Sequence, residues 1–243
     1  MILVNNRPIL VNSRPLIIND SPAPAPTLPN DMDFLYFAKD VFGSKITNSA
    51  PNSTFGDYLV AGTLLLLDTG ANAFLYNSSS ASNYLYKDLT TEQLNAMKAI
   101  DSTYTFFIRV QQDTNDMGGI ISWRNGNSYI YMIRGYQKQL QLHTTTGYNC
   151  GSDFVLTSDK VYKVVINGSS FKAYNLNNNA EYSLTYSTNR TMTSRMTTFN
   201  ADLGSSGEAN LDRFYALAGI PRATTAEEDE VIKQCMLNQS TTY

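Results

Sequence analysis

The sequence is poor in the side chains that most often perform catalysis, since its 243 residues include one histidine and two cysteines. His143 has no reactive serine or cysteine motif near it, which argues against a catalytic triad. Cys150 and Cys235 lie far apart in the sequence and are compatible either with two buried thiols or with a disulfide. The cysteines therefore do not identify a cellular compartment.

Charge and long apolar runs are also scarce. The chain has 18 basic and 21 acidic residues, a net charge of −3, and no basic stripe, which argues against nucleic acid as its partner. Apolar runs such as Leu64–Leu67 are far too short to cross a bilayer, so we expect no membrane span. What the chain has instead is tyrosine, with 16 residues, together with much serine, threonine and asparagine. This composition favours β-strands joined by tight turns.

A seven-residue motif occurs three times at the N-terminus, at 2–8, 9–15 and 16–22. Each copy begins with three apolar residues, continues with Asn and ends in Pro, so a helix is excluded and short extended segments are favoured. We expect a repetitive arm, residues 1–22, that anchors the chain to a partner protein. Its candidate binding residues are Ile2, Leu3, Val4, Arg7, Ile9, Leu10, Val11, Arg14, Leu16, Ile17 and Ile18. The alternatives are a first strand pair of the folded domain and, with a poor match to the pattern, a signal peptide.

Residues 23–30 read as a stiff, proline-rich linker, and residues 31–243 as one domain. Within it, residues 31–100 supply either the first strands of the sandwich, which we favour, or an oligomerisation collar. Helices are predicted at 90–100, capped by Thr90 or Thr91, and at 224–237, capped by Thr224 or Thr225. Strands are predicted in the remainder, at 58–61, 64–67, 104–110, 119–123, 129–133, 139–143, 161–166, 171–174, 182–186 and 211–219. Turn signals separate them, with a hairpin turn at Asn125-Gly-Asn127 and another at Asn167-Gly168.

Several of these segments carry a resemblance to a known family. They are the strand Phe106-Phe-Ile-Arg-Val110, the strand Gly118-Gly-Ile-Ile-Ser-Trp123, the hairpin beginning at Tyr162 and the closing strand, loop and helix from Leu211. Together they resemble the laminin-G-like, concanavalin-A-like lectin and glucanase family. The resemblance covers about residues 100 to 240. It implies an all-β, antiparallel jelly-roll sandwich with an extended N-terminal arm and a short C-terminal helix, and fold alone does not imply function.

The glucanase branch of that family hydrolyses glycans with paired acids, and this sequence lacks the pair. The branch carries them on a strand of the form Glu-x-Asp-x-x-Glu, whereas between Ser102 and Leu217 the glutamates are Glu181 and Glu208. The acids of 227–230 open a helix, where the dipole accounts for them. We therefore expect no enzyme and no cofactor. Asp113, Asn115 and Asp116 offer oxygens to calcium, but a polar turn explains them better, so we expect no metal.

Carbohydrate binding would need exposed aromatic rings. Tyr129 and Tyr131 share one face of a strand with core positions, so our candidates for a glycan platform are Trp123, Tyr136 and Tyr148.

An anchoring arm, a stiff linker and a lectin-like head resemble the layout of bacteriophage head fibres and tail-fibre tips. The resemblance implies a virion structural protein, assembled in the host cytoplasm, whose arm binds a capsid or tail protein while the head contacts cell-surface glycans. It also implies a homo-oligomer, with a trimer favoured. The alternative is a secreted or cell-surface bacterial glycan-binding module.

Overall fold

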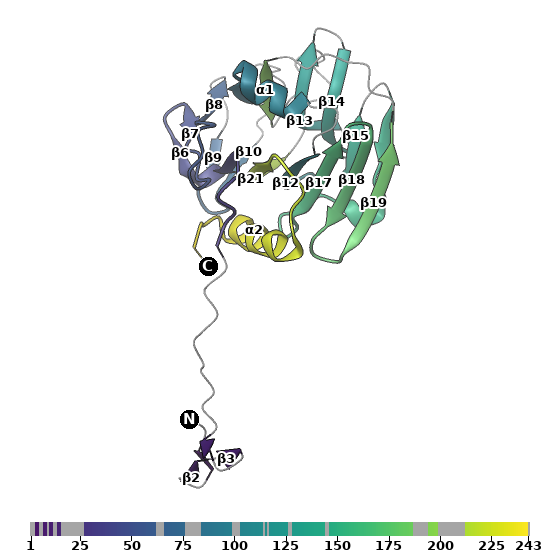
Figure 1. Ribbon diagram of the computed structural model, residues 1–243. Coiled ribbons are helices and arrows are strands. Elements are labelled where there is room, and N and C mark those ends of the chain that lie inside the picture. The colour runs from purple at the N-terminus through teal and green to yellow at the C-terminus, as the bar shows by residue number, and fades with distance from the viewer. Residues whose placement is uncertain are drawn as a thin grey trace.

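In the computed structural model the chain forms two antiparallel sheets packed face to face, with a helix outside one of them (Figure 1). The predicted all-β antiparallel sandwich with a short C-terminal helix is confirmed. The structure describes residues 3–4, 7–8, 10–11, 14–15, 27–61, 66–75, 84–98, 103–113, 115, 117–125, 128–143, 146–186, 194–198 and 212–242.

The eight-stranded sheet has the order β19-β18-β17-β12-β21-β10-β9, and β5 also pairs with β21. Its strands are β5 (Phe34–Phe37), β9 (Leu66–Asp68), β10 (Ala73–Leu75), β12 (Thr103–Gln111), β17 (Tyr162–Asn167), β18 (Ser170–Asn175), β19 (Ala180–Thr185) and β21 (Arg213–Ile220). One edge of β21 is shared, because β10 pairs with Arg213 and Phe214 while β5 pairs with 216–219. A strand from early in the chain therefore lies beside the last strand.

The nine-stranded sheet has the order β16-β15-β14-β13-β20-β11-β8-β7-β6. Its strands are β6 (Val41–Phe42), β7 (Lys45–Ile46), β8 (Tyr58–Ala61), β11 (Tyr84–Asp88), β13 (Met117–Asn125), β14 (Ser128–Tyr136), β15 (Gln139–His143), β16 (Gly147–Asn149) and β20 (Arg195–Thr198). The hairpin predicted around Asn125 is present, with Asn125 opposite Ser128. Strand β20, from late in the chain, thus joins the group β13–β16 to the early strands β11, β8, β7 and β6.

The main core lies between the sheets, where alternate strand residues point inward. On β12, Phe106 and Ile108 belong to this core together with Trp123 of the opposite sheet, and the rings of Phe106 and Trp123 are 5.7 Å apart. Phe107, between them, belongs to a second cluster on the outer face. The eight-stranded sheet therefore has apolar packing on both faces.

Helix α2 (Ala226–Asn238) covers part of that outer face (Figure 1). Of the two predicted caps, Thr225 is the one that caps it, and a capping box with Glu228 completes its first turn. Ile232 and Met236 pack with Phe107 of β12. At the other end, the Arg109 guanidinium donates to the carbonyl oxygens of Met236 and Leu237, at 2.8 and 3.0 Å. The end carbonyls of α2 are thereby satisfied from the sheet.

A shorter helix, α1 (Thr91–Lys98), begins after Thr90, whose side chain accepts from the Gln93 amide. Leu94 and Met97 face the main core, and Ile100 lies outside the described residues. Two single turns of 3-10 helix, η1 (Ala38–Asp40) and η2 (Ser152–Phe154), complete the helical elements of the described chain. Among the helices described, none has the length and apolar character needed to span a membrane.

Both cysteines are buried free thiols. Cys150 belongs to the core between the sheets, and Cys235 belongs to the cluster beneath α2. Burial raises the pKa of Cys150 to about 12 and that of Cys235 to about 11. The two thiols serve as small apolar groups in separate clusters.

Each of the first two N-terminal repeats forms its own hairpin. In the first, β1 (Leu3–Val4) pairs with β2 (Arg7–Pro8), and in the second, β3 (Leu10–Val11) pairs with β4 (Arg14–Pro15). The register is the same in both, with valine opposite arginine and leucine opposite proline. The predicted extended pieces are present, but each has its partner within the same repeat. Ile2, Ile9, Leu16, Ile17 and Ile18 lie outside the described residues.

Candidate functional site

The strongest candidate site is the outward face of the β17–β18 hairpin. Three cross-strand pairs point away from the core: Lys163 opposite Tyr174, Val165 opposite Lys172, and Asn167 opposite Ser170. The residues between them, such as Val164 and Phe171, are fully buried in the main core. Because side chains alternate along the two strands, one set packs in the core and the other lies on the outer face of the hairpin.

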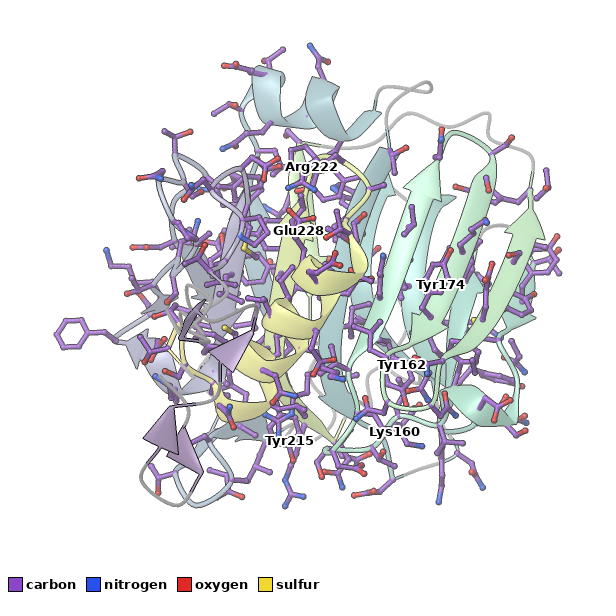
Figure 2. All side chains as sticks on the ribbon, turned by 60° about the horizontal axis from the view of Figure 1, so that its bottom comes forward. Lys160, Tyr162, Tyr174, Tyr215, Arg222 and Glu228 are labelled. Atoms are coloured by element: carbon purple, nitrogen blue, oxygen red, sulfur yellow. The ribbon has the colours of Figure 1, made fainter. Side chains whose placement is uncertain are left out.

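These six outward residues line a groove of about 320 Å³. Thr103 of β12 and the turn residues Ala223 and Thr224, which precede α2, form its remaining wall. Figure 2 shows Tyr174 on the sheet beside α2, with Arg222 and Glu228 at the start of that helix. The groove is thus a sheet surface closed on one side by the turn before α2.

Lys163 is held in place within the groove. Its ammonium group lies 2.7 Å from an Asp229 carboxylate oxygen on α2 and 5.2 Å from the centre of the Tyr174 ring. Asp229 also accepts a hydrogen bond from the Thr224 hydroxyl. Only 10% of the Lys163 side chain is exposed, so this lysine joins the sheet, the helix and the turn.

Lys172 is much freer than Lys163. Its side chain is 47% exposed, and its ammonium group lies 3.6 Å from Glu181 of β19, whose side chain is 49% exposed. Ion pairs this open contribute little to stability and exchange readily with solvent or a ligand. Lys172 is therefore the charged group of the groove that can reorient toward a bound molecule.

Tyr174 provides the aromatic surface of the groove and is half-buried. Burial, with a contribution from the Glu181 carboxylate, raises the pKa of its phenol. The hydroxyl is consequently neutral at physiological pH and can both donate and accept a hydrogen bond. A ring with such a hydroxyl, next to amide and hydroxyl side chains, suits a polar ligand that has an apolar face.

A second cavity, of about 280 Å³, has the opposite charge. It is lined by Asp33, Thr54, Phe55, Thr90, Glu92 and Gln93. Burial raises the pKa of Asp33, although the hydrogen bond donated by the Tyr104 hydroxyl, at 2.7 Å, acts against that shift. Its aromatic residue, Phe55, is 3% exposed, so this cavity offers little ring surface to a ligand.

The aromatic residues predicted from sequence do not line either cavity. The prediction for Trp123 is wrong, because its side chain is 1% exposed and lies in the main core. Tyr136 and Tyr148 are half-buried on β14 and β16 of the nine-stranded sheet, and Tyr136 lies beside the Arg134 guanidinium. A glycan-binding role for these two tyrosines stays a prediction.

The sequence predicts β17 and β18, but none of their outward residues is among the site residues predicted from it. A signal was present after the predicted turn at Asn167-Gly168, where polar and apolar residues alternate from Ser170 to Ala173 and place Lys172 on the outward face. Within the part of the chain that the structure describes, no three His, Cys, Asp or Glu side chains gather as a metal site would require.

Arg222 fixes the turn that forms the groove wall. Its guanidinium makes two contacts with Asp31, at 2.5 and 2.8 Å, and two with Glu228, at 2.8 and 2.7 Å. The hydrogen bonds and charge of Arg222 lower the pKa of both carboxyls. Because Asp31 precedes β5, this network joins the start of the sandwich to the start of α2.

This network predicts an acid-sensitive contribution to stability. A lowered folded-state pKa stabilises the protein above the ordinary carboxyl pKa, and the gain disappears as the pH falls through the lowered value. Arg222→Gln should therefore reduce the melting temperature near neutral pH, with the deficit shrinking between pH about 5 and about 3. Thermal unfolding of both proteins across this range checks it, and a deficit independent of pH would contradict it.

The sequence matches no family model and no curated protein. Solved structures do resemble the fold. A sialidase of Trypanosoma rangeli in complex with sialic acid is 11% identical with a TM-score of 0.56, over 96% of this chain and 35% of its own.

Botulinum neurotoxins give similar values. A type C structure, described by its interaction with two ganglioside molecules, is 10% identical with a TM-score of 0.59, over 85% of this chain and 51% of its own. The binding domain of neurotoxin DC in complex with SialylT is 10% identical with a TM-score of 0.55, over 85% of this chain and 52% of its own. The chain thus spans about a third to a half of the proteins it resembles. The similarity shows a shared β-sandwich fold.

Proposed function

We propose that this protein is a glycan-binding β-sandwich whose ligand site is the groove beside Tyr174. The observation that carries the proposal is the set of three outward cross-strand pairs, which place an aromatic ring next to amide, hydroxyl and ammonium groups. Sugars present an apolar ring face and a rim of hydroxyls, which match such a surface. The similar structures include a sialidase in complex with sialic acid, a neurotoxin binding domain in complex with SialylT and a neurotoxin that interacts with gangliosides, and these support the same class of ligand.

The proposal is for binding without hydrolysis. Hydrolysis by paired acids places two carboxyl groups about 5 Å or more apart across the scissile bond. The described lining of the groove instead offers two lysines, and the nearest acids, Asp229 and Glu181, are each paired with one of them. Incubation with a sialylated or neutral oligosaccharide should therefore return it intact. Release of a monosaccharide would make the protein an enzyme.

The layout of the chain extends this proposal to a virion. We infer a bacteriophage head-fibre or decoration protein, oligomeric and most simply trimeric, whose N-terminal arm binds a capsid or tail protein and whose head contacts host glycans. Its support is the repetition in the arm, where two hairpins share one register and so present equivalent docking elements. The proposed location is the virion, assembled in the host cytoplasm.

Loss of the Tyr174 ring should remove most of the glycan affinity. Tyr174→Ala is expected to weaken binding by about 2 kcal/mol, or roughly thirtyfold, which is typical of an aromatic residue at the centre of a site. Glycan-array screening followed by calorimetry of the best ligand measures this effect. Tyr174→Phe, which keeps the ring, should retain most of the affinity.

Tyr136→Ala tests the competing site, since Tyr136 is a half-buried strand tyrosine outside the groove and one of the glycan-binding candidates predicted from the sequence. With the groove as the ligand site, this variant should bind like the wild type. Loss of binding in Tyr136→Ala but not in Tyr174→Ala would move the site to the nine-stranded sheet.

The arm is tested in the full-length chain with Arg7→Glu and Arg14→Glu. Arginine pairs strongly with carboxylates, and two equivalent hairpins should act together, so the double variant should dock more weakly than either single variant. The measurement is the amount of this chain in purified particles, by quantitative mass spectrometry. Equal incorporation of wild type and double variant would remove these arginines from the docking role.

A further inference from the structure

The geometry points to a carboxylate-bearing sugar, such as a uronic or sialic acid, as the ligand of the groove. This inference rests on the proposed glycan-binding function and specifies its ligand class. The carrying observation is that both charged residues lining the groove, Lys163 and Lys172, are basic, although the chain as a whole has a net charge of −3. The basic groove is therefore a local feature rather than a consequence of overall composition.

The second cavity shows that this bias is specific to the groove. The charged residues lining it, Asp33 and Glu92, are both acidic. In the first cavity Lys172, whose exposed partner Glu181 lies 3.6 Å away, can pair with an anion, whereas the charged side chains lining the second cavity would repel one. The two cavities of the same sandwich thus differ in the sign of the ligand that they select.

Lys163 and Lys172 have different tasks toward an anion. Lys163 is largely buried and committed to Asp229, so it shapes the wall and holds its charge near the Tyr174 ring. Lys172 faces solvent with a loose partner 3.6 Å away, so it can form a charge-assisted hydrogen bond to a ligand carboxylate. Lys172 is therefore the group that selects acidic over neutral sugars.

Glu181 competes with the ligand for Lys172. In the sheet it lies opposite Tyr174, and its carboxylate also accepts from the Ser183 hydroxyl at 3.1 Å. A ligand carboxylate would take the place of Glu181 beside the Lys172 ammonium, whereas a neutral sugar leaves that ion pair unchanged. Removing the charge of Glu181 should consequently strengthen the binding of acidic sugars.

The test compares two pairs of oligosaccharides, the members of each pair differing in one acidic residue: sialyllactose against lactose, and a glucuronate-ended against a glucose-ended disaccharide. Isothermal titration calorimetry on the full-length protein gives the ratio of acidic to neutral affinity. We expect a preference of about tenfold for the acidic ligand, in the range of one charged hydrogen bond. Added salt should reduce this ratio, because Lys172 is exposed.

Three charge variants then show which residue is responsible for the preference for acidic sugars. Lys172→Gln should bring the ratio close to one, and Glu181→Gln should raise it. Lys160→Gln is the control, since it changes the net charge equally at a residue that does not line the groove and lies away from Tyr174 in Figure 2. It should leave the ratio unchanged.

The outcomes separate this inference from the proposed function. Equal binding of acidic and neutral sugars, or a preference lost equally in Lys160→Gln, overturns the ligand class and leaves the glycan-binding proposal standing. Binding of neither sugar, by wild type or Glu181→Gln, overturns both. Circular dichroism of each variant verifies that its fold is retained.

Discussion

Replacing Trp123 by alanine should lower the free energy of unfolding by about 3–5 kcal/mol, the range for removing a large buried aromatic side chain. Trp123 is 1% exposed and is among the largest fully buried side chains of the described chain. Its ring lies 5.7 Å from that of Phe106, so the substitution opens a cavity between the two sheets. Urea unfolding followed by circular dichroism measures the change.

Trp123→Phe distinguishes the effect of lost side-chain volume on stability from the effect of the buried polar N–H group. The indole N–H is buried and has no hydrogen-bond partner among the described residues, which costs stability. Phenylalanine removes that unsatisfied group and keeps most of the apolar contact, so we expect a much smaller loss than with alanine. Equal losses in the two variants, or normal stability with loss of glycan binding, would contradict a purely structural role.

Arg109→Met should lower the free energy of unfolding by about 2–3 kcal/mol, because part-buried carbonyl groups lose a charged donor. Arg109 donates to Ser158, Met236 and Leu237 and lies 4.5 Å from the centre of the Tyr215 ring. Its charge also interacts favourably with the C-terminal dipole of α2. Hydrogen exchange should be fastest, relative to the wild type, in the last turn of α2.

Arg195→Met is the matched control for Arg109. Arg195 makes two hydrogen bonds to Asp88, at 2.6 and 2.9 Å, but its side chain is 44% exposed. Exposed pairs contribute about 0–1 kcal/mol, so this variant should remain near wild-type stability. Comparable losses at both arginines would show that burial is not the deciding factor.

The sequence predicted those parts of the fold whose signals are local. Turn residues such as Asn167-Gly168 and the capping threonine at 225 specify a backbone conformation by themselves, and β17, β18 and α2 lie close to their predicted bounds. Strand β11, Tyr-Leu-Tyr-Lys-Asp, and strand β20, Arg-Met-Thr-Thr, were not predicted. They are short, and each is held by its pairing with the other and by one buried apolar residue, Leu85 or Met196, in the main core.

The site was harder to predict because exposure is a tertiary property. Trp123 has the composition expected of a sugar platform, but only the packing of the opposite sheet reveals that its ring is covered. Lys163 and Tyr174 are unremarkable in the sequence and become a pair through the hairpin register. The wall of the groove comes from residues 223 and 224, about 50 residues later in the chain, which no local pattern connects to the hairpin.

The register of the β17–β18 hairpin also bears on how this protein can diversify. Six outward positions between Lys163 and Tyr174 carry the proposed recognition, and the intervening inward positions, such as Val164 and Phe171, carry the core. Mutation can therefore alter one set while leaving the other intact, all within a segment short enough to be exchanged by a single recombination event. A library randomised at the five positions other than Lys163, which joins the sheet to α2 through Asp229, should yield folded variants with new sugar preferences.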